Sequence, residues 1–317
     1  MARSVPSIEA IKLTKEYDSF TALDKLNLRI EGAKCVGFLG PNGAGKTTTL
    51  KIFTDLIHRS SGEALICGFD VHSDKKKALA AVAALVETPE IYPSLTPREA
   101  LMIIAKLRGV PSEIRNKKIE EAIHEVHMED WENKKIGNFS KGMKQRIAIA
   151  STLLSDPEII LLDEPTSGLD PRGMSEVREM VKNLKKRKRL IFMSSHLLSE
   201  VTDVCDEAAL IDHGKLLVYD TIRNLTDKFS GGGSALEVGF AGSHIDNALV
   251  ERIRKIHGVT GIEILDDRNL RLRFVGNAET QAEILSELGA LRVGANSFKT
   301  SSSALEDVYL NLIKENV

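Results

Sequence analysis

A short apolar run leads directly into a glycine-rich segment and then into a helical pattern. This succession constrains the fold more than any other feature of the chain. The apolar run is Cys35–Leu39, and the segment after it reads Gly40-Pro41-Asn42-Gly43-Ala44-Gly45-Lys46-Thr47. Glycines let the backbone curl so that successive N–H groups point at phosphate oxygens, and the helix start adds its positive end. The sequence therefore predicts an α/β fold with a parallel-sheet core, in which one strand ends in a phosphate-binding loop. From Ile8 to about Asp220, short β-branched runs alternate with helical patterns, which predicts a parallel sheet covered by helices over this whole range.

The residues of this loop predict contacts with a nucleoside triphosphate. Lys46 offers a mobile cation for the β- and γ-phosphates, and the Thr47 hydroxyl is a candidate ligand of Mg²⁺. The residues expected to contact the nucleotide are Gly40, Pro41, Asn42, Gly43, Ala44, Gly45, Lys46, Thr47 and Thr48.

Two further apolar runs, Ile159–Leu162 and Leu190–Met193, are typical of strands buried on both faces. Ligands of open parallel sheets bind beyond the carboxyl ends of such strands. Asp163 and Glu164 follow the first run, and we predict that Asp163 is a metal ligand and Glu164 the general base. His196 follows the second run, and we predict that its Nε2–H contacts the γ-phosphate.

Ser140 precedes a helical pattern whose first turn is basic. Cations are poorly placed near the positive end of a helix, so this arrangement favours an anion docked there. We expect the Ser140 side chain, the Gly142 N–H and the helix start to bind phosphate oxygens.

The length of 317 residues predicts about two domains, which we place at residues 1–222 and 223–317. A helical subdomain at about residues 88–155 is expected as an insertion into the first. Its first helix is expected to begin after Thr96, with Pro97 at the first position and Glu99 completing a capping box, and to end at Gly109. A flexible stretch, Ser230–Ser234, follows the start of the second. The rest of the second domain predicts a small α+β module of ferredoxin-like βαββαβ order. Its expected elements are strands Leu236–Phe240, Ile262–Leu265 and Leu270–Val275, a last strand at Leu291–Val293 or Phe298–Thr300, and helices His244–Ile256, Glu279–Leu288 and one from Ala304.

Composition excludes several classes of protein. Charge nearly cancels, with 43 Lys and Arg against 45 Asp and Glu, so no attraction to nucleic acid is expected. The longest apolar stretch, Ala78–Val86, is too short to span a membrane. The N-terminus has no secretory pattern, and the three cysteines are few and odd in number, which favours a reducing cytoplasm. We expect Cys35, Cys67 and Cys205 to be small core residues.

Taken together, the ordered motifs resemble the ATP-binding cassette (ABC) transporter ATPase subunits, over about Ile8–Asp220. That family is a P-loop NTPase, and the resemblance implies that ATP and Mg²⁺ bind. By resemblance, Tyr17 stacks on adenine, Glu87 holds the Q-loop position with an oxygen for Mg²⁺, and Ser167–Asp170 is the D-loop. His196 matches the switch histidine, and Ser140–Met143 holds the place of the signature motif.

The resemblance also implies partners and a location. Cassettes of this family pair head to tail, so a second ATPase subunit, as a homodimer, and a separate transmembrane permease are expected. The chain would then be peripheral on the inner face of the cell membrane. The loop from Glu87 to Thr96 is expected to contact the permease.

The sequence departs from the usual family pattern in three motifs. Glu87 replaces a glutamine, Phe139-Ser140-Lys141-Gly142-Met143 replaces Leu-Ser-Gly-Gly-Gln, and Gly168 stands where alanine is common. The first two variants look similar to those of subunits that serve ABC-2-type export permeases, and Ala304–Leu310 resembles the ending of drug-export ATPases.

Three other functions remain open from the sequence. A soluble ABC ATPase that acts on DNA or ribosomes would commonly carry two cassettes or a long coiled coil, and heptads are absent here. A small-molecule kinase would not need the Ser140–Gln145 element. A nucleotide-gated binding module with little turnover is compatible with Glu87 and Lys141.

Overall fold

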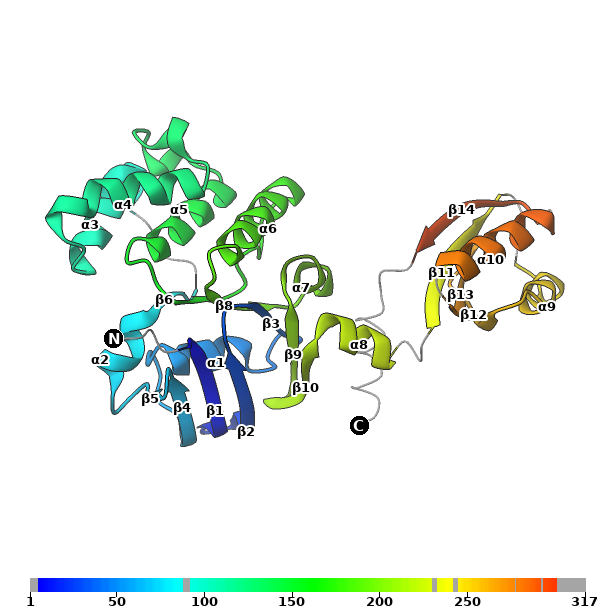
Figure 1. Ribbon diagram of the computed structural model, residues 1–317, viewed down its shortest axis with the longest axis horizontal. Helices are drawn as coiled ribbons and strands as arrows, with labels where there is room; N and C mark the ends of the chain where they lie inside the picture. The colour runs from blue at the N-terminus through cyan, green and yellow to red at the C-terminus, as the bar shows by residue number, and fades with distance from the viewer. Residues whose placement is uncertain are drawn as a thin grey trace. The chain divides into compact units, whose positions relative to one another are not determined.

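The computed structural model describes residues 5–87, 92–229, 233–241, 245–276, 278–291 and 293–300. The chain divides into two compact units, Met1–Asp220 and Thr221–Val317 (Figure 1).

The centre of the first unit is a six-stranded sheet in the order β10-β9-β3-β8-β7-β6. Its strands are β3 (Cys35–Leu39), β6 (Val82–Leu85), β7 (Ile159–Leu162), β8 (Leu190–Ser195), β9 (Glu207–Asp212) and β10 (Lys215–Thr221). All neighbouring pairs from β6 to β9 are parallel. β10 follows β9 after the two-residue turn His213–Gly214 and therefore runs back, which makes the sheet mixed.

The three predicted strands are confirmed, and they are neighbours. Each of β3, β7 and β8 is buried along its whole length. In register, Leu39 pairs with Ser195 and Leu162 pairs with Met193, so the carboxyl ends of the three strands lie side by side.

A second sheet of the first unit has the order β2-β1-β4-β5 and is antiparallel throughout. Its strands are β1 (Ser7–Tyr17), β2 (Phe20–Glu31), β4 (Ser61–Ile66) and β5 (Phe69–Asp70). The prediction of a parallel sheet from Ile8 onward was wrong for this part, because the Asp18–Ser19 turn between β1 and β2 is too short for a parallel crossover.

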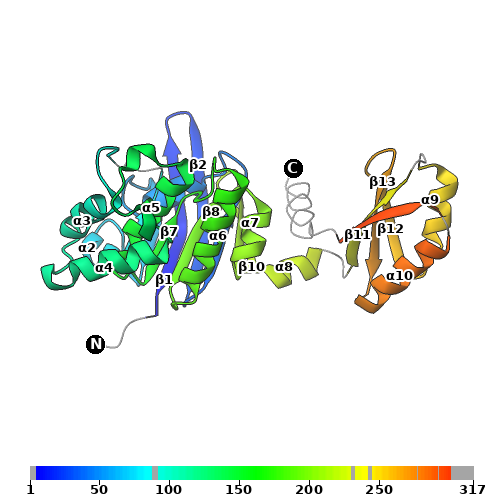
Figure 2. The same cartoon turned by 90° about the horizontal axis from the view of Figure 1, so that it is seen from above.

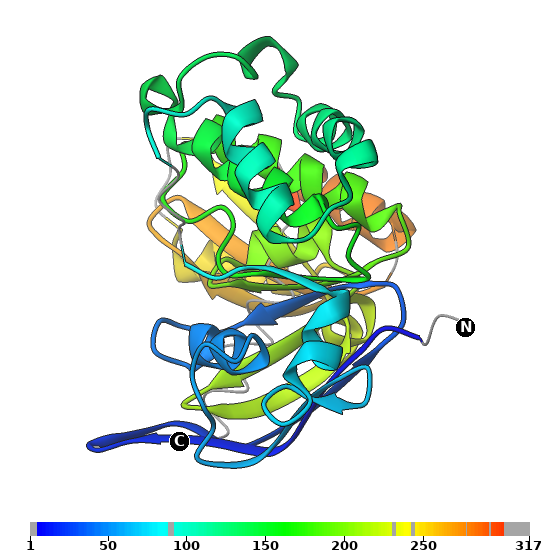
Figure 3. The same ribbon diagram turned by 90° about the vertical axis from the view of Figure 1, so that its left-hand side faces the viewer.

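Helices cover both sheets. They are α1 (Lys46–Phe53), α2 (Lys75–Ala78), α3 (Pro97–Leu107), α4 (Ser112–Glu125), α5 (Lys141–Leu153), α6 (Pro171–Lys185) and α7 (Leu198–Val204), with 3₁₀ turns η1 (Leu79–Ala81), η2 (Glu129–Trp131) and η3 (Ile136–Asn138). α1 packs against β2 and β4, and its apolar residues share one core with strands of both sheets. α3, α4 and α5 form a helical group, inserted between β6 and β7, that stands apart from the antiparallel sheet (Figures 1 and 3).

The predicted start of the first inserted helix is confirmed. Thr96 caps α3: its Oγ1 accepts a hydrogen bond from the Glu99 N–H at 3.2 Å, and its own N–H donates to Glu99 Oε2 at 2.8 Å. Pro97 occupies the first helical position, where no N–H is needed. Gly109 follows the last turn with φ +70°, a conformation that glycine adopts without strain.

The second unit holds a four-stranded antiparallel sheet in the order β12-β13-β11-β14. Its elements are α8 (Ile222–Phe229), β11 (Gly233–Phe240), α9 (Asn247–Arg254), β12 (Val259–Ile264), β13 (Asn269–Val275), α10 (Ala278–Ala290) and β14 (Ala295–Thr300). Alternate residues of β13 share a core with apolar residues of α9 and α10, so both helices cover one face of the sheet (Figure 2).

Several expectations for this unit need adjustment. β11 begins at Gly233 and so includes part of the stretch expected to be flexible. The last strand lies at Ala295–Thr300, around the second of the two alternatives. α8 was not expected, and the helix expected from Ala304 lies outside the described residues.

All three cysteines are free; Cys35 and Cys205 are core residues as expected, whereas Cys67 is only partly buried against the core. Cys35 and Cys205 are buried, and their Sγ atoms lie 3.5 Å apart. Within the described ranges, no helix combines the length and the apolar character that crossing a membrane requires.

Candidate functional site

The loop between β3 and α1 has the conformation that its glycines permit. Gly43 and Gly45 have φ of +83° and +103°, which other residues rarely adopt. Gly40 needs to be small for another reason, since an added Cβ would lie 2.3 Å from the carbonyl oxygen of Ile211 on β9. The loop is therefore packed tightly against the sheet edge at which β3 ends.

Lys46 is the first residue of α1, and its side chain extends back to the loop. Its Nζ donates to the carbonyl oxygens of Gly40 at 2.8 Å and Pro41 at 3.0 Å, and its side chain is 5% exposed. The same Nζ lies 3.4 Å from Glu164 Oε1. A pocket of about 210 Å³ opens beside it, lined by Phe20, Ala22, Asn42, Gly43, Gly45, Lys46, Thr47, Thr48 and Glu164.

Asp163, at the end of β7, accepts hydrogen bonds from both neighbouring elements. Thr47 Oγ1 on α1 lies 3.1 Å from Asp163 Oδ1, and Ser194 Oγ on β8 lies 2.6 Å from the same oxygen. The Ser194 hydroxyl also accepts the backbone N–H of Glu164 at 2.8 Å. The fixed register of the parallel strands thus joins the loop, Asp163 and Glu164 in one network.

Glu164 bridges two basic groups. Besides Lys46, its carboxylate contacts His196, whose Nδ1 lies 3.1 Å from Glu164 Oε2. The backbone of Glu164 has φ +42°, a left-handed conformation that costs free energy for a side-chain-bearing residue. Lys46, Glu164 and His196, each predicted from a different segment of the chain, are therefore linked by contacts beside the pocket.

A buried carboxylate supports this edge from behind. Glu200 on α7 is 2% exposed and accepts hydrogen bonds from the Thr166 hydroxyl and, at 2.7 Å, from the Ser195 hydroxyl. These bonds fix the segment after β7 to the end of β8. Sequence reasoning missed Glu200, Thr166 and Ser194, because nothing in a single helical acid or in isolated hydroxyl residues distinguishes them from surface residues.

Two predicted residues lie beside the pocket without lining it. Glu87 follows β6, an unpredicted strand, and its carboxylate contacts Lys51 on α1. That hydrogen bond raises the pKa of Lys51 above its usual value. Tyr17 stacks on Phe20 with ring centroids 5.3 Å apart, and it is Phe20 that lines the pocket. The sequence feature that could have identified Phe20 is its position as a second aromatic residue, directly after the two-residue turn Asp18–Ser19 that follows Tyr17.

Ser140 and Gly142 lie in the helical group. Ser140 caps α5 by accepting the Met143 N–H at 3.2 Å. Among the described residues, no hydrogen bond or ion pair joins Ser140 or Gly142 to the loop of residues 40–47, so the structure does not bring the two phosphate-binding candidates together.

The start of α5 is instead fixed to the start of α6. An added Cβ at Gly142 would lie 3.5 Å from Gly173 Cα, and Arg146 pairs with Glu176 at 3.4 Å. The Lys141 side chain lies against Gly168, where an added Cβ would come within 2.2 Å of its Nζ. Asp170, the residue that caps α6, thus belongs to a segment in contact with the cap of α5.

Comparison with known proteins gives consistent results. A sequence profile of the family described as "ABC transporter" matches residues 23–167. The bacitracin transport ATP-binding protein BcrA of Bacillus licheniformis is 35% identical over 311 residues, which cover 96% of this chain and 97% of BcrA. The linearmycin resistance ATP-binding protein LnrL of Bacillus subtilis (strain 168) is 28% identical and covers 96% of this chain and 97% of its own length. A solved structure described as the ATP binding subunit of an ABC transporter is 26% identical with a TM-score of 0.62, over 70% of this chain and 92% of that one.

The buried Glu200 network predicts a stability effect. In Glu200→Ala, the Thr166 and Ser195 hydroxyls lose their shared acceptor inside the protein, so the free energy of unfolding should fall by roughly 1–3 kcal/mol. Urea denaturation measures this change. Glu179→Ala, on an exposed position of α6, is the matched control and should change stability by less than about 0.5 kcal/mol. Equal stability of the two variants would contradict a structural role for Glu200.

Proposed function

The chain belongs to the ABC transporter family as an ATP-binding protein, and from this premise we propose that it drives a separate export permease by head-to-tail pairing of two ATP-hydrolysing copies. The observation that carries the proposal is the network at the ends of β3, β7 and β8, where Lys46, Asp163 and Glu164 meet beside one pocket.

Residues that line the pocket and residues beside it have separate roles in this proposal. The loop N–H groups and Lys46 hold the phosphates, and the stacked Tyr17 and Phe20 rings offer a surface for adenine. Glu164 accepts a proton from the attacking water, and His196, in contact with Glu164, orients that carboxylate and faces the γ-phosphate. The contact of Lys46 with Glu164 keeps the base beside the phosphate-binding cation.

The residues present fit Mg²⁺. Mg²⁺ prefers oxygen ligands, and neighbouring ligands of an octahedral ion with bonds of about 2.1 Å lie about 3 Å apart. Thr47 Oγ1 and Asp163 Oδ1 are such oxygens and lie 3.1 Å apart. Thr47 and Asp163 would hold the ion, with Glu87 as a further oxygen donor on the adjacent strand end. When bound, the ion would neutralise charge on the β- and γ-phosphates.

We propose that two copies pair because the two candidate phosphate-binding elements of one chain do not contact each other. Ser140 and Gly142 present a helix N-terminus suited to phosphate, yet no described contact joins them to the loop of their own chain. A second copy placed head to tail would bring its Ser140 and Gly142 to the ATP held by Lys46 of the first. We propose a homodimer with two such composite sites and no nucleic acid partner.

Export is proposed from the relatives. The bacitracin and linearmycin proteins carry transport or resistance in their names and align over almost the whole chain.

We propose that residues 1–222 are the ATPase domain and that residues 223–317 are an accessory domain. The accessory domain is ferredoxin-like, supported by its βαββαβ succession and strand order. The chain would lie in the cytoplasm on the inner face of the cell membrane, with the loop from Glu87 to Thr96, of which residues 88–91 lie outside the described ranges, against the permease.

Glu164→Gln tests the chemistry. The amide keeps the size of the carboxylate but cannot accept the proton, so ATP hydrolysis should slow at least about a hundredfold while ATP binding persists. Phosphate release and equilibrium binding of ATP measure the two properties. Lys46→Ala is the companion variant and should lose ATP binding itself. Undiminished turnover in Glu164→Gln would show that another group is the base.

Ser140→Arg tests the composite site. In the Glu164→Gln background, ATP should induce a dimer that light scattering detects after gel filtration. A bulky cation at the α5 cap should prevent that dimer and leave ATP binding to the monomer unchanged. Asn116→Arg on an exposed position of α4 is the control and should dimerise normally. A normal ATP-dependent dimer in Ser140→Arg would refute the pairing.

Reconstitution tests the transport role. The chain should purify in a constant ratio with the membrane protein encoded in a neighbouring reading frame, and the complex in vesicles should move substrate outward only with ATP. The complex containing Glu164→Gln should assemble and fail to transport. Absence of a stable complex together with full ATPase activity of the isolated chain would contradict this role.

A further inference from the structure

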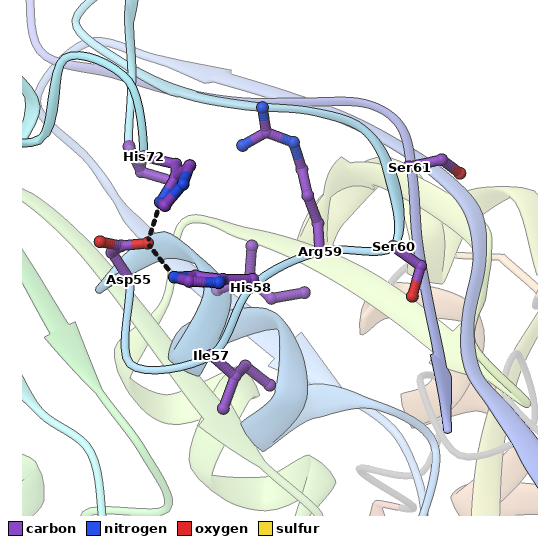
Figure 4. Close-up of a pocket in the computed structure, with 9 residues that line it drawn as sticks. Asp55, Ile57, His58, Arg59, Ser60, Ser61 and His72 are labelled. Carbon is purple, nitrogen blue, oxygen red and sulfur yellow. Dashed lines mark hydrogen bonds and ion pairs between the residues drawn. The ribbon is translucent and has the colours of Figure 1, made fainter. Parts of the chain in front are cut away.

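The far end of α1 carries a second cluster of chemically active side chains. α1 begins at Lys46 and ends at Phe53, and Asp55 follows two residues later. His58 lies in the connection to β4, and His72 follows β5. Figure 4 shows both imidazole rings directed at the carboxylate of Asp55.

The ligand atoms of these three residues converge on one small volume. Asp55 Oδ1 lies 3.1 Å from His72 Nδ1 and 3.8 Å from His58 Nε2, and the three ligand atoms all lie within 4.8 Å of one another. Atoms bound about 2.1 Å from a tetrahedral zinc ion lie roughly 3.4 Å apart. The two measured distances fall on either side of that value. The side chains of His58 and His72 are 68% and 55% exposed, so small rotations can bring their ligand nitrogens to the spacing that a zinc ion requires.

The surroundings hold these ligands in place. The Asp55 side chain is only 6% exposed. Asp70 accepts the His72 N–H at 3.0 Å and pairs with Arg59 at 2.9 Å, so it fixes the residue next to His58 as well as the turn that carries His72. The buried side chains of Ile52 and Val71 also line the pocket, which has a volume of about 320 Å³. Outer hydrogen bonds and an apolar shell of this kind orient metal ligands in proteins.

We propose that Asp55, His58 and His72 form a binding site for a divalent transition metal of the zinc type, with the fourth position open to water. The two imidazole nitrogens are borderline donors that suit zinc, and zinc also accepts a carboxylate oxygen, whereas Mg²⁺ and Ca²⁺ prefer oxygen alone. The position favours a cation for another reason, because the site lies just beyond the negative C-terminal end of α1. Within the described ranges, this is the one group of three His, Cys, Asp or Glu residues whose ligand atoms converge in this way.

Lys75 competes with the ion for the carboxylate. Its Nζ lies 2.8 Å from Asp55 Oδ2, the oxygen that faces away from the histidines. Burial would raise the pKa of Asp55, but the hydrogen bonds from Lys75 and His72 outweigh that effect and hold it below its usual value. The Lys75 ammonium therefore partly neutralises the carboxylate charge that a metal ion would use.

The test is calorimetric titration of the full, tag-free and nucleotide-free chain with Zn²⁺, supported by the visible absorption of Co²⁺ in the same site. The wild-type chain should bind Zn²⁺ at least about tenfold more tightly than the His58→Ala/His72→Ala variant. The variant should also lose the absorption of tetrahedral Co²⁺. His124→Ala/His127→Ala removes another pair of neighbouring histidines from the same unit and should bind as the wild type does.

The Lys75→Met variant tests whether Asp55 is a ligand, because it frees Asp55 Oδ2 from its ion pair and removes a positive charge from the site. Zn²⁺ affinity should rise severalfold in this variant. Equal affinities of the wild type and the His58→Ala/His72→Ala variant would overturn the proposal. An unchanged or lower affinity in Lys75→Met would overturn the place of Asp55 among the ligands. Neither readout depends on ATP hydrolysis, so the result is independent of the proposed transport role.

Discussion

The parallel register of β3, β8 and β7 is the constraint on which the rest of the first unit depends. Hydrogen bonding in this order brings three carboxyl ends to one edge, with Leu39 beside Ser195 and Leu162 beside Met193. A shift by one residue in any pair would exchange the two faces of a strand, which would disrupt the packing of its side chains and draw the polar residues at its end into the core. The unbroken burial of the three strands makes such a shift costly, and it is this cost that holds Asp163 within reach of Thr47 and Ser194.

The residues around the pocket divide into those to which we assign a role in the proposed reaction and those that hold these residues in position. Lys46, Glu164 and His196 line up in contact, and a single carboxylate separates the two basic groups. Behind them, Ser194 and Glu200 contribute only hydrogen bonds, yet these fix where the acting groups lie. A left-handed backbone at Glu164 is tolerated because its N–H is held by Ser194 and its side chain by Lys46 and His196.

The sequence was sufficient for features that depend on local chemistry. The glycine loop, the three buried strands and the Thr96 capping box all follow from residue type and spacing, and each lies where it was predicted. Sequence reasoning missed features that depend on contacts between segments far apart in the chain. β6 is a short alanine-rich run that becomes a strand only beside β7, and Glu200 becomes a buried acceptor only because α7 packs under β8. Phe20 lines the pocket because β1 and β2 form an antiparallel pair with a tight turn between them. The predicted parallel arrangement of this region did not include such a turn.

The contacts between the starts of α5 and α6 have a consequence for association. Lys141 lies against Gly168, Gly142 lies close to Gly173, and Arg146 pairs with Glu176, so contacts within one chain join the start of α5 to the start of α6 and the residues before it. A surface that is already ordered loses little conformational entropy when it meets a mate. In the pairing that we propose, two copies would therefore bring together surfaces that intrachain contacts already hold in place, and little of the binding energy would be needed to order the interface.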